Sequence, residues 1–148
     1  MDAPPLARLH LAIEGSGVPL AQALDAFRSF LDASGVDERA HYVATLAFEE
    51  LVVNVLRHAG IRPGAEDAVV EVEAAVSEDA VRFRVEDRGP PFDPTAHPEP
   101  PPPDSIESAP IGGLGIQIVR RSVDRIDYAR TAKGNRVEVT VRRAGEDA

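Results

Sequence analysis

The chain contains no cysteine, so disulfide bonds and thiolate metal sites are excluded. It also lacks an excess of basic residues, because 16 Lys and Arg against 25 Asp and Glu give a formal net charge of −9. General nucleic-acid binding depends on Lys and Arg displacing counterions from phosphates, so we expect no direct nucleic-acid partner. Apolar runs long enough to cross a bilayer are absent, and the N-terminus does not resemble a signal peptide. We therefore expect a cytoplasmic protein without membrane contact.

Length and hydrophobic content predict a single domain over residues 1–148. The 148 residues, 43% of them hydrophobic, provide the apolar material for one ordinary core. Prolines are concentrated in one region, where nine of the 13 fall between Pro90 and Pro110. Because proline neither pairs in a central strand nor continues a helix, we predict a long loop at about residues 90–111. Loops of this length are either functional lids or disordered inserts.

Hydrophobic periodicity predicts the order strand, helix, helix, strand, strand, loop, helix, strand, strand. The expected strands cover residues 6–13, 68–77, 80–86, 125–131 and 136–142, and the expected helices begin near Pro19, Asp37 and Gly115. This order predicts an α+β fold, a two-layer sandwich in which three helices cover one face of a mostly antiparallel, mixed sheet. A two-residue turn after residue 77 would place Glu73 opposite Arg84, a favourable cross-strand pair.

The helix expected around residues 48–60 carries polar side chains at a regular interval. Glu50, Asn54 and His58 are spaced four residues apart, so they lie on one side of an otherwise apolar helix. Burying a carboxylate, an amide and an imidazole without hydrogen bonds is costly. These residues therefore face either solvent at a helix edge or a polar cavity, a metal or a ligand, and the helix alone does not distinguish the alternatives.

Two glycine-containing segments are further candidate binding elements. The string IGGLG at residues 111–115 opens an apolar helix, and backbone N–H groups at a helix start can hold phosphate, although such glycines also serve simple turns. The string DRG at residues 87–89 ends a strand. The carboxylate of Asp87 can accept a hydrogen bond from an exocyclic amine such as that of adenine, and Gly89 leaves room for a flat ring. A tight turn after the strand is the alternative.

In their order along the chain, these segments resemble the motifs of the GHKL superfamily of ATP-binding domains. EELVVNVLRHA resembles the first box of the superfamily, DRGPPFDP the second and IGGLGIQIVRR the third, while GNRVEVTV resembles its closing strand. Within the superfamily the chain is most similar to the small anti-sigma factor serine kinases. The resemblance implies a Bergerat-type ATP-binding fold over nearly the whole chain, with the proline-rich loop as the ATP lid.

The resemblance implies roles for the polar residues of the second helix. Asn54 matches the ligand of a Mg²⁺ ion that bridges the ATP phosphates, and an amide oxygen suits such an ion. Glu50 matches the catalytic general base that accepts a proton from the attacking hydroxyl. Glu49 is the weaker candidate because it lies about 100° away around the helix. His58 matches a position for which a supporting hydrogen bond is expected.

The resemblance also implies which residues contact the nucleotide. Asp87 matches the aspartate that binds adenine, and Gly89 matches the glycine beside it. Gly113, Leu114 and Gly115 match the segment that binds the phosphates. ATP and Mg²⁺ are therefore the expected ligands, with Mg²⁺ binding dependent on the nucleotide.

Partners are implied by the same resemblance. Proteins of this type bind a sigma factor in one state and phosphorylate a serine of a small anti-anti-sigma partner in another, and they commonly form homodimers. Histidine kinases need a preceding helical segment with a phosphoacceptor histidine, and gyrase-type ATPases need transducer domains. Because this sequence begins with the first strand and ends with the last, we expect a free-standing kinase domain.

The sequence departs from the family pattern in the loop. Some kinases of this type carry a basic residue there that contacts the γ-phosphate, whereas residues 94–111 contain no Lys or Arg. Phosphoryl transfer depends on stabilising charge on the moving group, so Arg120, Arg121 or a partner subunit would have to supply it. Two alternatives therefore stay open. One is a nucleotide-dependent binding module without kinase activity, and the other is a free-standing histidine-kinase-like catalytic domain.

Overall fold

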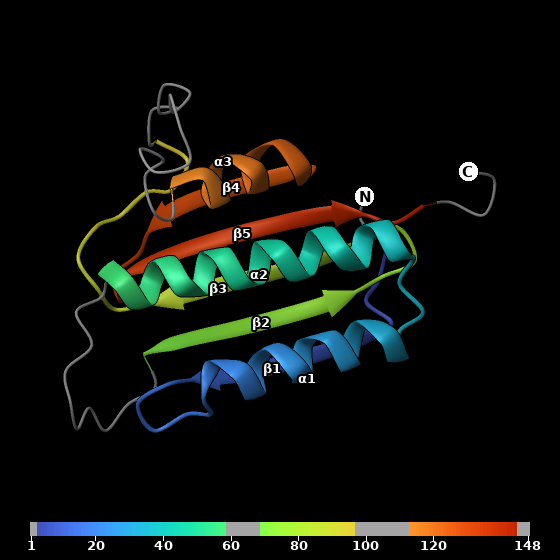
Figure 1. The fold of residues 1–148 in the computed structure, drawn as a ribbon, viewed down its shortest axis with the longest axis horizontal. Coiled ribbons are helices and arrows are strands. Elements are labelled where there is room, and N and C mark those ends of the chain that lie inside the picture. Colours follow the sequence, from blue (N-terminus) through green and yellow to red (C-terminus); the bar gives the residue numbers. More distant parts are fainter. Residues whose placement is uncertain (1–2, 59–68, 97–112, 145–148) are drawn as a thin grey trace.

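Three helices and five strands form the part of the chain that the structure, a computed structural model, describes: residues 3–58, 69–96 and 113–144. Their order is β1 (Ala7–Ile13), α1 (Leu20–Ala33), α2 (Glu38–His58), β2 (Val70–Val76), β3 (Ala80–Asp87), α3 (Gly113–Ser122), β4 (Arg125–Arg130) and β5 (Asn135–Arg142). The three helices cover one face of the sheet (Figure 1). The predicted α+β fold and its element order are therefore confirmed.

The sheet has the strand order β1-β2-β3-β5-β4, and every neighbouring pair of strands is antiparallel. The prediction of a mixed sheet is wrong for these strands. The reason is that the chain passes from β3 through α3 to the sheet edge, where it forms β4, and β5 then returns between β4 and β3. An isolated parallel bridge also joins Ile13, at the end of β1, to Val18.

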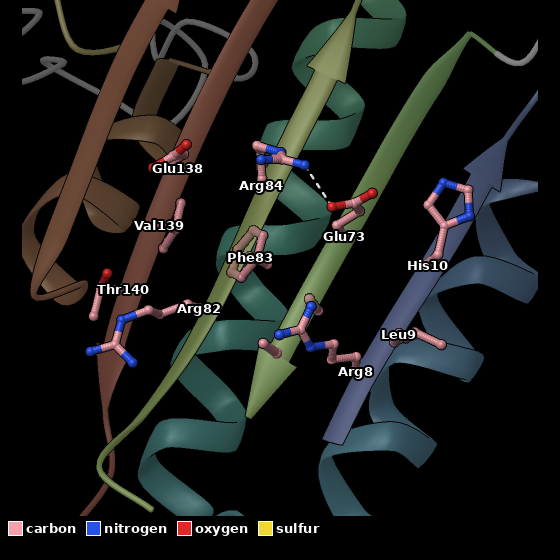
Figure 2. A pocket seen from close by; sticks show the side chains of 12 residues that line it. Arg8, Leu9, His10, Glu73, Arg82, Phe83, Arg84, Glu138, Val139 and Thr140 are labelled. Carbon is pink, nitrogen blue, oxygen red and sulfur yellow. Dashed lines mark hydrogen bonds and ion pairs between the residues drawn. The ribbon is translucent and has the colours of Figure 1, made fainter. Parts of the chain in front are cut away.

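The face of the sheet opposite the helices is lined with charged side chains. Glu73 and Arg84 lie opposite each other as predicted, and Arg84 Nη2 is 2.6 Å from Glu73 Oε2 (Figure 2). Arg84 Nε also lies 2.7 Å from a carboxylate oxygen of Glu86. Because these side chains are partly solvated, each pair contributes little to stability. The Glu73–Arg84 pair forms only when β2 and β3 are in this register, so it favours this register over shifted ones.

Three phenylalanines join the two layers at the centre of the molecule. Phe27 of α1 and Phe48 of α2 stack with their ring centroids 4.4 Å apart, and Phe83 of β3 meets Phe27 edge-on at 5.5 Å. Phe27 and Phe48 are fully buried, and Phe83 is 3% exposed. This cluster holds α2 over the middle of the sheet, so that the C-terminal half of α2 runs above the ends of β3 and β5.

Helix α2 begins where the sequence predicts, at an aspartate cap. Asp37 Oδ2 accepts a hydrogen bond from the backbone N–H of Ala40 at 3.1 Å, and Asp37 Oδ1 accepts another from Ala144 at 2.9 Å. Burial by itself would raise the pKa of this carboxyl, but the backbone hydrogen bonds from Ala144 and Ala40 and the charge of Arg143 together lower the pKa below 3.8. The cap therefore also ties the end of the sheet to the start of α2.

Some sequence predictions fall on segments that are not described. The expected end of the second helix near Gly60 and most of the predicted loop at residues 90–111 lie outside the described residues, which resume at 69 and 113. The described part of the loop runs from Pro90 to Ala96. Among the described helices, none combines the length and the apolar character needed to cross a membrane.

Candidate functional site

A narrow cavity of about 20 Å³ lies between the C-terminal half of α2, the end of β3 and the start of β5. The structure brings three predicted site residues into its lining: Asn54, His58 and Asp87. Asn135 and Phe92, which the sequence analysis did not identify, complete its polar and aromatic lining. Leucine, valine and proline side chains form the rest of the wall. A larger hollow of about 560 Å³ lies elsewhere, on the charged face of the sheet, where Arg8, Glu73 and Arg84 line it (Figure 2).

Asn54 is a buried polar residue without a partner in this lining. Its side chain belongs to a residue that is only 7% exposed, on an otherwise apolar stretch of α2. The amide makes no side-chain hydrogen bond to the residues that the structure describes. The amide atoms of Asn54 are not among the fully buried side-chain atoms without a partner in the described residues, so they keep some access to the cavity. A ligand in the cavity could therefore donate to this amide or accept from it, as the ligand-site interpretation requires.

Glu50 lies one helical turn before Asn54 and packs directly against the start of α3. A Cβ atom built on Gly115 would lie only 2.0 Å from Glu50 Oε2, so Gly115 has no side chain where the carboxylate of Glu50 sits. Gly115 belongs to the first turn of α3, where the helix dipole favours negative charge. Glu49, by contrast, lines a groove on the outer surface of α1 and α2 beside Tyr42. The structure therefore places Glu50, and not Glu49, at the glycine segment.

The other residues of the glycine segment are only partly described. Gly113 and Leu114 open α3, as predicted for a helix that starts in this string, and Gly112 lies outside the described residues. Arg120 and Arg121 are in the last turn of α3. At 1.5 Å per residue they are about 10 Å along the axis from the glycines. Arginine from this helix is therefore badly placed to replace the basic residue that residues 94–111 lack.

Asp87, the last residue of β3, uses only one of its carboxylate oxygens within the described part of the protein. Oδ1 accepts a hydrogen bond from the backbone N–H of Gly89 at 2.7 Å and another from Asn135 Nδ2 at 3.1 Å. The bond to Gly89 closes a tight turn after the strand, which is the alternative role expected for the DRG string. Asp87 can form this turn and still bind a ligand, because its Oδ2 has no hydrogen-bond partner among the described residues.

Asn135, the first residue of β5, is the centre of a hydrogen-bond network at the cavity floor. It is 5% exposed and lies directly opposite Asp87 in the β3–β5 register. Its Nδ2 also donates to the carbonyl of Pro90 at 2.9 Å, and its Oδ1 accepts from Tyr128 Oη at 2.5 Å and from the backbone N–H of Phe92 at 3.3 Å. The sequence signal was the alternation in β5, which puts residue 135 on the same inward face as three valines.

The comparisons with known proteins agree with this arrangement. The sequence pattern of the histidine kinase-like ATPase domain family matches residues 18–141. The chain belongs to this family. Its matched region contains Glu50, Asn54, Asp87, Gly115 and Asn135, so the whole cavity lies inside the ATPase domain. The predicted GHKL resemblance is confirmed, and an ATPase domain of this kind implies ATP binding.

Two relatives illustrate the similarity. Serine/threonine-protein kinase BtrW of Bordetella bronchiseptica is 28% identical over 108 residues, which is 73% of this chain and 75% of that protein. The crystal structure of the RsbU and RsbW domains of Rv1364c from Mycobacterium tuberculosis matches 95% of this chain with a TM-score of 0.64 and 19% identity. This chain corresponds to 34% of that longer chain, and the likeness supports the histidine kinase-like fold.

In this histidine kinase-like domain, His58 lies over the mouth of the cavity. Its imidazole stacks on the ring of Phe92, with centroids 4.1 Å apart and an angle of 17° between the planes. The supporting hydrogen bond expected of His58 stays a prediction, because the described residues show only this stack. Phe92, at the start of the predicted lid, is held beside the helix by the bonds of Pro90 and Phe92 to Asn135.

Proposed function

We propose that the chain is an anti-sigma factor serine kinase. It binds ATP with Mg²⁺, holds a sigma factor in one state and phosphorylates a serine of an anti-anti-sigma partner in another. The observation that carries this proposal is the placement of the Glu50 carboxylate against the first turn of α3, one helical turn from Asn54 and on the same side of α2 as the Asp87 cavity. The Bordetella relative, named a serine/threonine-protein kinase, supports the same activity.

Nucleotide binding in this proposal uses the cavity described above. Asp87 Oδ2 accepts a hydrogen bond from the exocyclic amine of adenine, and Gly89 leaves room beside the ring. The cavity of about 20 Å³ has the space of about one water molecule, so the Phe92 ring moves off His58 when the base enters. The backbone around Gly113, Leu114 and Gly115 receives the phosphates at a helix start.

The unpaired amide of Asn54 fits the ion that accompanies ATP. An amide oxygen is a hard ligand of the kind that Mg²⁺ accepts together with phosphate oxygens and waters. Bound there, the ion would neutralise charge on the phosphates. Asn54 is the residue of this chain that would hold it, and its place in the cavity lining, with no side-chain hydrogen bond to the described residues, supports the assignment.

The transfer step uses Glu50 as the base. The serine hydroxyl of the partner protein attacks the γ-phosphorus, a new P–O bond forms, and the bond from the γ-phosphorus to the β,γ-bridging oxygen breaks. The serine proton passes to the Glu50 carboxylate, and ADP leaves with the bridging oxygen. Because Arg120 and Arg121 lie at the far end of α3, another arginine or lysine, from this chain, a partner subunit or the protein substrate, supplies the charge stabilisation.

A nucleotide-dependent binding module without kinase activity is the second candidate function. The absence of Lys and Arg from residues 94–111 favours it, because a lid without positive charge gives no stabilisation to a moving phosphoryl group. A catalytic domain that phosphorylates histidine is a further alternative. We also propose that the protein is a cytoplasmic homodimer whose single domain spans residues 1–148.

One experiment separates these functions. The protein is incubated with γ-labelled ATP, Mg²⁺ and a candidate anti-anti-sigma partner, and ATP binding is measured in parallel by calorimetry. Acid-stable phosphoserine on the partner, lost in Glu50→Gln while ATP binding persists, is the expected result. Binding of ATP without any transferred label would support the binding module, and acid-labile label would indicate phosphohistidine. Glu49→Gln is the matched control, because that carboxylate faces the outer groove.

A further inference from the structure

The orientation of the Asn135 amide is determined by its neighbours. Nδ2 faces the carboxylate of Asp87 and the carbonyl of Pro90, which only accept hydrogen bonds. Oδ1 faces three donors, the hydroxyl of Tyr128, the backbone N–H of Phe92 and the guanidinium of Arg130. Exchanging the amide nitrogen and oxygen would set donors against donors on one side and acceptors against acceptors on the other. The amide is therefore fixed in one orientation.

The backbone of β3 at Asp87 is packed closely against the backbone that precedes β5. A Cβ atom built on Gly134 would lie 2.0 Å from the carbonyl oxygen of Asp87, so the two strands touch backbone to backbone at this point. Asp87 and Asn135 are direct cross-strand partners, and both are inward-facing. Rotation of the Asp87 carboxylate would break its bonds to Gly89 and Asn135 together. One oxygen is therefore held, and the other is left for a ligand.

We propose that Asn135 is the positioning residue that gives the Asp87 cavity its selectivity among purines. By holding Oδ1 of Asp87, it leaves Oδ2 as one fixed acceptor, which suits the exocyclic amine of adenine and opposes the carbonyl oxygen that guanine has at the same position. Two acceptors left facing each other in a partly buried site are unfavourable, so the selectivity is for an amino-purine. This inference rests on the proposed binding of ATP and adds a residue that acts through Asp87.

Asn135 also links base recognition to the predicted lid. The same amide that holds Asp87 bonds to Pro90 and Phe92, the first residues after the DRG string. A change at residue 135 therefore releases both the base acceptor and the start of the loop. Aspartate would fit the space, but it would set a second carboxylate against Asp87, and one of two adjacent carboxylates then retains a proton to a higher pH.

The test measures the affinities of Asn135→Asp for ATP and GTP by calorimetry between pH 5 and pH 8, beside the wild-type protein. We expect ATP affinity to fall about tenfold at pH 8, as for loss of one hydrogen bond to a charged group, and to recover toward pH 5 as the carboxyl pair takes up a proton. The ratio of ATP to GTP affinity should fall as well. His58 and Arg130 also lie beside this pair, so variant and wild type are compared at each pH.

Two further variants keep the test decisive if Asn135→Asp does not fold. Tyr128→Phe removes the hydroxyl that donates to Asn135 Oδ1, and we expect a few-fold loss of ATP affinity with a lower ATP to GTP ratio. Thr140→Ala is the control, because Thr140 lies on the charged face of β5, the strand that begins with Asn135; it should change neither the ATP affinity nor the ratio of ATP to GTP affinity. If both Tyr128→Phe and a folded Asn135 variant keep the wild-type affinities and ratio, the role of Asn135 is overturned while the proposed function stands. If wild-type protein binds no nucleotide, both the role of Asn135 and the proposed function are overturned.

Discussion

At the scale of single residues, the contact between Glu50 and Gly115 gives a second explanation for the glycine at position 115. The sequence suggests that Gly115 lacks a side chain so that phosphate can approach the backbone. The structure shows that the carboxylate of Glu50 already occupies the space beside it. The missing Cβ therefore positions the proposed base, whatever it also does for phosphate.

Substitution of Gly115 by alanine separates these two roles. The methyl group would push the Glu50 carboxylate aside, so we expect phosphoryl transfer to fall about tenfold or more while ATP affinity changes about twofold or less. In a Glu50→Gln background the same change should have no further effect on transfer, because both act on one group. Equal losses of ATP affinity in both backgrounds would instead assign Gly115 to the phosphates. Transfer assays and calorimetry give the two readouts.

Asn54→Ala tests the proposed ion ligand. If the proposed assignment is right, wild-type protein should bind ATP more tightly when Mg²⁺ is present, because the Asn54 amide would help to hold the ion beside the phosphates. The alanine variant should lose this difference while its affinity in EDTA stays close to that of the wild type. Calorimetric titration with and without Mg²⁺ measures it. A variant that keeps the full Mg²⁺ effect would show that another residue holds the ion.

The site residues that the sequence revealed are those with a local pattern. Glu50 and Asn54 follow helical spacing, and Asp87 stands at a strand end beside a glycine. Asn135 was missed because its importance depends on a bond to a residue 48 positions away, which appears only when β3 and β5 pair. The stack of Phe92 on His58 depends in the same way on how the chain turns after β3.

At the scale of elements, α2 is the one on which the site depends, and its start was predictable. Aspartate before a helix is a strong N-cap signal, and Asp37 caps α2 as expected. The predicted stop near Gly60 lies outside the described residues, and the described part of α2 reaches His58. The mixed sheet was wrongly predicted because strand order depends on where α3 returns the chain, which no single strand encodes.

Asp37→Ala tests the cap and its charge. At pH 7 we expect a loss of about 1 kcal/mol in the free energy of unfolding. The folded-state pKa of Asp37 is lowered, so its stabilisation is fully present above the unfolded value of 3.8 and is lost as the pH falls through the lower folded pKa. The difference between variant and wild type should therefore shrink in strong acid. Urea denaturation measures it, with Asp25→Ala, on the exposed side of α1, as the control variant.

At the scale of the whole molecule, the three phenylalanines hold the layers together. Phe27, Phe48 and Phe83 are all buried in the described structure. The sequence pattern does not predict that their rings meet, because ring contacts depend on how the helices cross the sheet. The cluster fixes the distance between α2 and β3, and thereby the width of the cavity at their ends.

Phe27→Ala should destabilise the whole fold. Removing a fully buried ring costs about 3–5 kcal/mol, a large part of the stability of an ordinary domain. Leu6→Ala, at a residue that is 63% exposed, should change stability by about 0.5 kcal/mol or less. Thermal and urea unfolding give the comparison. A small loss for Phe27→Ala would mean that the helices are held to the sheet by other contacts.

The bond between Tyr128 and Asn135 also has a spectroscopic consequence. The chain has no tryptophan and two tyrosines, so its ultraviolet emission comes from Tyr42 and Tyr128 alone. Tyr42 is 68% exposed, whereas the hydroxyl of Tyr128 belongs to the network beneath the cavity. In Tyr42→Phe the remaining emission should report on that network, and its change on adding nucleotide would follow occupancy without an attached dye. The protein thus carries its own optical probe at the floor of the proposed base site.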